Sequence, residues 1–160
     1  MATHCLVARE NRDGSFDAIY VHFGHPSGIG PLLVREYTQD TKIAQLLALG
    51  ALSHLGEEIG QKQNFERNNP KWCLAYERDR GDDPEPAVHI ESVPDLIQYA
   101  RRRFIAHVFV RRWELCLWAK VQMPDETEES VQALVSEHLA RLDRKPSPPL
   151  GLGTIAEDTP

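Results

Sequence analysis

Two histidines and three glycines are concentrated in residues 20–30, where a strand pattern gives way to a helix pattern. Histidine can donate to a phosphate or act as a general acid or base near neutral pH. Glycines let a ligand approach the backbone, and the N–H groups at a helix N-terminus attract anions. The alternative is a strand-to-helix turn that needs glycine only for its geometry, because the spacing matches neither a phosphate loop nor a dinucleotide fingerprint. The candidate ligand-binding residues of this stretch are Tyr20, His22, His25, Gly28 and Gly30.

Arginines form a second set of residues suited to chemistry. Arg78 and Arg80 lie in one predicted turn, residues 101–103 end a predicted helix, and Arg111 and Arg112 lie in a predicted hairpin turn. Guanidinium groups match the geometry of phosphate oxygens, so we include Arg78 and Arg80 in the candidate site as anion contacts. The alternative is a solvated basic face, since arginine at a helix C-terminus is already favoured by the helix dipole.

Other catalytic patterns are weak. His22 and His25 lie three positions apart and Cys5 precedes them, but a structural zinc site normally shows a second close pair of ligands. No Gly-x-Ser-x-Gly elbow occurs, and the acidic residues 79–85 are interpreted as solvating a turn. We therefore predict no catalytic residue, no metal and no cofactor, and favour a protein that is not an enzyme.

The histidine stretch follows a predicted β-hairpin. Residues 3–9 and 16–23 form its strands and Gly14 lies in its turn, with Ile19, Val21 and Phe23 on the face toward the core. A helix is expected from Pro31, and another from Asp40 or Thr41 to a stop at Gly50. The spacing of the apolar residues between 52 and 59 suggests one further packed turn.

The arginines belong to the second half of the chain. Short strands are expected at residues 72–76 and 87–91, followed by a helix that a Ser92–Asp95 capping box opens. A hairpin is expected from residues 103–110 and 113–121, with alternating apolar and polar positions. An amphipathic helix is predicted to begin at Asp125 or Thr127.

Strands and helices thus come in separate runs, which predicts an α+β fold rather than a doubly wound nucleotide fold. We expect a bent antiparallel sheet of about five or six strands, with helices packed on one side. Residues 1–144 form one domain in this interpretation. Residues 145–160, rich in proline and acidic residues, are predicted to be a disordered tail.

Composition limits the choice of partners. The net charge of -6 disfavours a nucleic-acid backbone as a ligand. No apolar run approaches the roughly 20 residues of a membrane span, and the N-terminus lacks the apolar region of a signal peptide. The three cysteines are widely spaced and are not a disulfide framework. The expectation is a cytoplasmic protein that contacts no membrane.

Several motifs resemble a family of small, largely uncharacterised proteins found in phages, plasmids and bacterial genomes. Its pattern is Tyr-Cys-His-Trp/Phe-Asp-Gly-Tyr-Pro, then Gly, Leu-Leu, and a Leu-Gly-(Asp)-Leu-Ser-x-Leu-Gly segment. The resemblance covers about residues 3–121 and includes the hairpin with Trp113. The matching positions are Tyr20, His22, Phe23, Gly24, Pro26, Gly30, Leu32, Leu33, Leu49, Gly50, Leu52, Ser53, Leu55, Gly56 and residues 75–76 and 78–81.

Two departures from the family pattern affect the candidate site. Val21 stands where cysteine is usual, and one residue, the usual aspartate, is missing between His22 and Pro26. The resemblance implies a mobile-element origin and no particular reaction. Together with the incomplete catalytic set, it favours a small binding protein that holds a protein partner or a small anionic ligand and interferes with a host defence system.

Two other functions compete with this hypothesis. One is a phosphate-handling enzyme in which His22 or His25 is the acid or base and Arg78 or Arg80 clamps the anion. The other is an oligomeric scaffold, for example a homodimer, joined through the predicted C-terminal helix.

Overall fold

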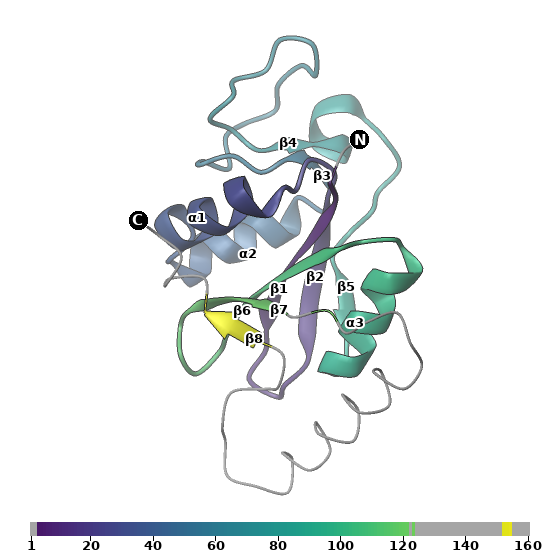
Figure 1. Cartoon of the computed structure of the whole chain (residues 1–160). Coiled ribbons are helices and arrows are strands. Elements are labelled where there is room, and N and C mark those ends of the chain that lie inside the picture. Colours follow the sequence, from purple (N-terminus) through teal and green to yellow (C-terminus); the bar gives the residue numbers. More distant parts are fainter. Residues whose placement is uncertain (1–2, 122, 124–151, 155–160) are drawn as a thin grey trace, which may run out of the picture.

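A computed structural model describes residues 3–121, 123 and 152–154 of the chain (Figure 1). The elements are, in order, β1 (Cys5–Glu10), β2 (Phe16–Val21), α1 (Pro26–Glu36), α2 (Asp40–Ala48), β3 (Leu52–His54), β4 (Leu74–Ala75), the π-helical turn η1 (Tyr76–Arg80), β5 (Val88–Ile90), α3 (Val93–Arg102), β6 (His107–Arg111), β7 (Trp118–Val121) and β8 (Leu152–Thr154).

The strands form one sheet in the order β4-β3-β2-β1-β6-β7-β8, and β5 also pairs with β2. The α+β class is confirmed. The sheet is mixed, however, and not antiparallel throughout, because β1 runs parallel to β6 and β2 runs parallel to β3. These two parallel pairs join segments that are distant in the sequence, so no local turn signal predicts them.

Helices cover both faces of the sheet, which corrects the expectation of helices on one side. Figure 1 shows α1 and α2 against one face and α3 against the other. Cys5 and Val7 of β1 pack in the core under α1 and α2, whereas Leu6 and Ala8 pack in the core under α3. The apolar run in β1 is typical of a strand that is buried on both faces.

The N-terminal hairpin is confirmed, with Cys5 opposite Val21 and Glu10 opposite Phe16. Gly14 takes a φ of 88° in the turn, a conformation that favours glycine. Ile19 and Val21 face the core under α1 and α2, as predicted. Phe23, predicted on the same face, lies beyond the strand and is 50% exposed.

Helix α1 begins five residues earlier than the predicted start at Pro31. Pro26 occupies its first turn, and the His25 side chain caps it by accepting from the Ser27 N–H. Pro31 therefore lies inside the helix. The predicted limits of α2 are confirmed, with Gly50 at a φ of 71°. The Ser92 cap of α3 is also confirmed and accepts from the Asp95 N–H.

Two predictions for short elements were wrong in detail. Residues 52–54 form strand β3 and not a packed turn. The second hairpin has shorter strands than predicted: β6 begins at His107 and not at residue 103, and Cys116, at a φ of 48°, interrupts the extended backbone before β7. Trp113, predicted within a strand, is exposed in the loop between β6 and β7, whereas Trp118 is buried and its Nε1 donates to the Tyr37 carbonyl at 2.8 Å.

The predicted C-terminal helix and most of the predicted tail lie outside the described residues. Residues 152–154, which fall in the predicted tail, form β8 and pair with β7. Within the described part of the chain, no helix has the length and apolar character needed to cross a bilayer.

Candidate functional site

The predicted glycine-histidine stretch is, at its centre, a strand-to-helix turn. The His25 Nδ1 lies 3.3 Å from the Ser27 N and 2.7 Å from the Ser27 Oγ, so this ring is engaged in capping α1. A Cβ atom on Gly24 would lie 2.5 Å from the Cys5 Sγ, so close packing requires glycine there. The space around Gly28 is open, and Gly30 is buried in α1. These contacts support the geometric interpretation for His25 and its glycines.

Tyr20 and His22, in contrast, belong to a hydrogen-bonded chain of side chains at the end of the sheet where β1 begins. The His4 Nδ1 lies 2.8 Å from the His22 carbonyl, which can only accept, so this nitrogen of His4 carries the proton. The Tyr20 hydroxyl lies 3.0 Å from the His4 Nδ1 and 2.9 Å from the His22 Nδ1. The single Nδ1 proton of His4 is thus shared between the His22 carbonyl and the Tyr20 hydroxyl, which in turn donates to the His22 Nδ1, and these contacts orient both rings.

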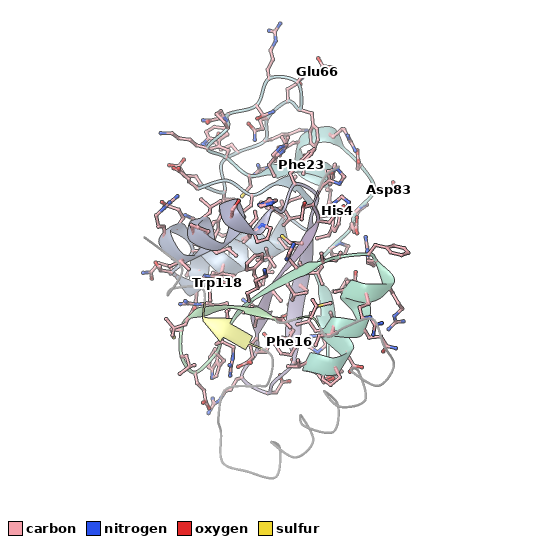
Figure 2. The ribbon with its side chains drawn as sticks, in the orientation of Figure 1. His4, Phe16, Phe23, Glu66, Asp83 and Trp118 are labelled. Atoms are coloured by element: carbon pink, nitrogen blue, oxygen red, sulfur yellow. The ribbon has the colours of Figure 1, made fainter. Side chains whose placement is uncertain are left out.

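An aromatic patch extends this chain across the surface. The rings of His22 and Phe23 meet edge to face at 4.6 Å, and those of Phe23 and His54 stack at 4.6 Å. Figure 2 shows His4 and Phe23 at the same end of the molecule, away from Phe16. We call this surface, formed by His4, Tyr20, His22, Phe23 and His54, the aromatic patch.

Tyr20 also lines a cavity of about 260 Å³, which we call the Tyr20 pocket. Tyr76 of η1 provides a second ring, and Ala51 closes the apolar side. The sheet, η1 and the segment that follows η1 therefore meet at this pocket. Its remaining lining residues are charged: Glu77, Arg80, Asp82, Asp83 and Glu85.

Arg80 is the one basic residue among the described residues that line the Tyr20 pocket, and it is ion-paired. Its Nε and Nη2 donate to the two carboxylate oxygens of Asp82 at 2.9 and 2.7 Å. Its guanidinium also lies 4.8 Å from the Phe65 ring centre and 4.9 Å from that of Tyr76. Arg80 therefore joins parts of the pocket wall, and its charge is already paired with that of Asp82.

Two of the four carboxylates are not neutralised in this way. Glu85 forms an ion pair with Arg103 at 2.8 Å, and Asp82 is paired with Arg80. Glu77 and Asp83 are exposed and form no ion pair within the part of the chain that the structure describes. The Tyr20 pocket is consequently acidic.

Arg78, also predicted to contact an anion, is occupied by the fold. Its guanidinium pairs with Asp79 at 2.9 Å and donates to the carbonyls of Ile59 and Cys73 at 2.8 and 2.7 Å. Asp79 is buried, which differs from its interpretation as a residue that solvates a turn. The Arg78–Asp79 pair connects the segment around residues 59–63 to η1, the element that lines the Tyr20 pocket.

Two of the seven predicted site residues, Tyr20 and Arg80, line the Tyr20 pocket, and His22 contacts Tyr20 in the aromatic patch. Sequence reasoning missed Tyr76, Glu77 and Asp83, which line the same pocket. The available signal was the density of acidic residues between positions 77 and 85, next to a tyrosine. Among the described residues, no group of three or more His, Cys, Asp or Glu side chains is arranged to hold a metal ion.

Comparison of the chain with family models, curated proteins and solved structures found no match. Function is therefore inferred from the chemistry of the site.

The histidines predict how stability changes with pH. Partial burial lowers the pKa of His22, His54 and His107 below the ordinary value of 6.5. Nearby charges lower the pKa further, from His4 for His22 and from Lys120 for His107. Below pH 6.5 the unfolded chain then binds more protons than the folded one, so stability is lost as the pH falls through the folded pKa values. We expect the melting temperature to fall between pH 7.5 and 5.5, measured by circular dichroism.

His22→Gln should reduce this loss, and His89→Gln is the matched control of opposite sign. The hydrogen bond that the His89 Nδ1 donates to the Asp17 carboxylate raises the pKa of His89, so His89 stabilises the fold at low pH and its removal should steepen the loss. A melting temperature that rises from pH 7.5 to 5.5 would contradict the assignment of neutral histidines to the aromatic patch.

Proposed function

We propose that this chain is a non-enzymatic binding protein that holds a protein partner at the Tyr20 pocket and the aromatic patch. The observation that carries the proposal is the composition of the pocket: two tyrosine rings and four carboxylates, with one arginine that is already paired. Such a pocket attracts a cation by charge and by the faces of its rings. The same charge disfavours a small anionic ligand at this position.

The size of the pocket favours a side chain over a free ligand. Pockets for drug-sized ligands span roughly 300–1,000 Å³. The Tyr20 pocket, at about 260 Å³, is suited to one lysine or arginine side chain of a partner. The fold already uses this contact, since the guanidinium of Arg103 lies 5.5 Å from the Tyr20 ring centre.

The aromatic patch provides the rest of the interface. It adjoins the pocket through Tyr20, and Phe23 is a half-exposed phenyl ring whose neighbours are held by hydrogen bonds and ring contacts. Aromatic residues are enriched at protein interfaces, where rigid rings contribute contact area at low entropic cost. A partner surface that fits would place a basic side chain in the Tyr20 pocket and apolar groups on the aromatic patch.

The resemblance to phage- and plasmid-encoded proteins favours a host protein as the partner. We propose that this partner is a component of a host defence system. The phosphate-handling alternative is weaker, because Arg78 and Arg80 are both bound to carboxylates. The scaffold alternative depends on the predicted C-terminal helix, which lies outside the described residues.

The proposal can be tested with a minimal probe of the basic side chain. Nα-acetyl-argininamide should shift the backbone amide signals of Tyr20, Tyr76, Glu77 and Asp83 in ¹H–¹⁵N spectra, whereas neutral Nα-acetyl-glutaminamide should not. The double variant Glu77→Gln/Asp83→Asn should weaken this binding by about fivefold, because two exposed charge pairs at about 0.5 kcal/mol each contribute about 1 kcal/mol in total.

The double variant Glu57→Gln/Glu114→Gln is the matched control, since it removes the same charge and neither side chain has a hydrogen bond or ion pair among the described residues. A host protein captured by the wild type should be lost from the pocket variant and kept by the control. Unchanged arginine binding in the pocket variant would show that the pocket is not the site.

A further inference from the structure

Four arginines line a second cavity, of about 280 Å³, at the end of the sheet opposite the Tyr20 pocket. Arg9 and Arg111 are register partners on the parallel strands β1 and β6, so both arginines lie at the same end of the sheet. The carboxylates of Glu10 and Asp40 also line this cavity, and Arg9 pairs with Asp17 at 3.4 Å, which still leaves an excess of positive charge. We call this cavity, with Arg9, Arg12, Arg111 and Arg112 in its wall, the arginine pocket.

Arg111 is buried there without a counter-charge. It is 8% exposed, and its guanidinium donates to two backbone carbonyls, those of Cys116 and Thr38. Within the described residues it forms no ion pair with a carboxylate. Burying a charged group is costly unless an opposite charge compensates it, so the fold leaves this cation to be neutralised from outside.

Arg112 has unused donors in the same pocket. It is 7% exposed, and its Nε donates to the Glu10 Oε2 at 3.0 Å. No acceptor among the described residues bonds its two Nη groups. Buried N–H groups are nearly always satisfied by a partner, water or ligand. These groups are donors available to whatever occupies the pocket.

We infer that the arginine pocket binds a phosphate group carried on a small molecule. Guanidinium forks give phosphate oxygens paired, charge-assisted hydrogen bonds, and Arg111 and Arg112 supply a buried charge and free donors respectively. Arg12 is exposed at the rim, pairs with no described carboxylate and adds a third charge. This site is separate from the Tyr20 pocket, so either proposal can fail without the other.

The other residues that line the arginine pocket limit the size of its ligand and include a thiol that can report binding. The exposed indole of Trp113 and the thiol of Cys116 line the same cavity. Its volume, about 280 Å³, suits a phosphate monoester and not a dinucleotide. Cys5 and Cys73 are fully buried, so alkylation of the native protein by iodoacetamide should modify Cys116.

The test is titration of the full chain with inorganic phosphate at pH 7.5, against sodium chloride at equal ionic strength. Phosphate should raise the melting temperature and slow the alkylation of Cys116, and chloride should do neither. Arg12→Gln should weaken phosphate binding about tenfold without loss of stability, since Arg12 is exposed and its side chain makes no hydrogen bond or ion pair among the described residues. Arg102→Gln, at an exposed position in α3, is the matched control and should bind phosphate like the wild type.

Equal effects of phosphate and chloride would overturn the inference, because they would show charge screening alone. Wild-type phosphate affinity in Arg12→Gln, with Cys116 unprotected, would also overturn it. Protection of Cys116 that is lost in Arg12→Gln and kept in Arg102→Gln would support the site independently of any change in melting temperature.

Discussion

Asp79→Asn is expected to lower the free energy of unfolding by about 3 kcal/mol, as measured by urea denaturation, because it disrupts a buried ion pair. Each Asp79 oxygen accepts two hydrogen bonds. Oδ1 accepts from the Gln63 N and the Arg78 Nε, and Oδ2 accepts from the Ala75 N and the Arg78 Nη2. An asparagine amide would place an NH₂ group opposite two of these donors, whichever way it is turned.

The Asp79→Asn variant should be destabilised around residue 79 as well as in the fold as a whole. Asp79 joins the segment at Gln63 to β4 and η1, so the amide protons of Gln63 and Ala75 should exchange faster in the variant. Asp83→Asn, at an exposed position shortly after η1, removes the same charge and should change stability by less than about 0.5 kcal/mol. Similar stability of the two variants would mean that the Asp79 network contributes little to the fold.

Local signals were sufficient for the elements whose ends are fixed by a single residue. Gly14 in the hairpin turn, Gly50 after α2 and Ser92 before α3 all lie where the sequence predicts them. Pro31 misled the prediction of α1, because Pro26 also fits a first turn and His25 can act as a cap although it is not one of the preferred capping residues.

Non-local pairing explains most of what the sequence did not predict. Strand β3 is three residues long, and its parallel contact with β2 joins Val21 to Leu52. No periodicity identifies so short a strand. The predicted strand of residues 113–121 is reduced to β7, because Cys116 takes a positive φ, which is uncommon for a residue other than glycine, asparagine or aspartate.

The candidate site was predicted in part for the same reason. Tyr20 and His22 are two positions apart on one face of a strand, so their proximity follows from the period of a strand. Tyr76 and Asp83 reach Tyr20 only because η1 and the segment after it fold back onto the sheet. Arg78 was predicted to be available to a ligand, because one of the acceptors that occupy it is 19 positions away in the chain.

The second large effect is expected at Glu10, the buried partner of Arg112. Its Oε2 accepts from the Arg112 Nε at 3.0 Å and its Oε1 accepts from the Trp113 N at 3.3 Å. Glu10→Gln removes the charge and sets an NH₂ group against one of these donors. Leaving a buried charge without its partner costs roughly 3–5 kcal/mol, so we expect a loss of about 3 kcal/mol in urea denaturation.

Phosphate should restore part of this stability if the arginine pocket is an anion site. In Glu10→Gln the pocket holds an additional uncompensated positive charge, so an anion that reaches Arg111 and Arg112 should bind more tightly than it does to the wild type. The stabilisation by phosphate over chloride should therefore be larger in Glu10→Gln, whereas Glu114→Gln should respond like the wild type. If Glu10→Gln loses stability and is stabilised by phosphate no more than the wild type, the charged groups of the arginine pocket do not bind ligands and contribute only to the fold.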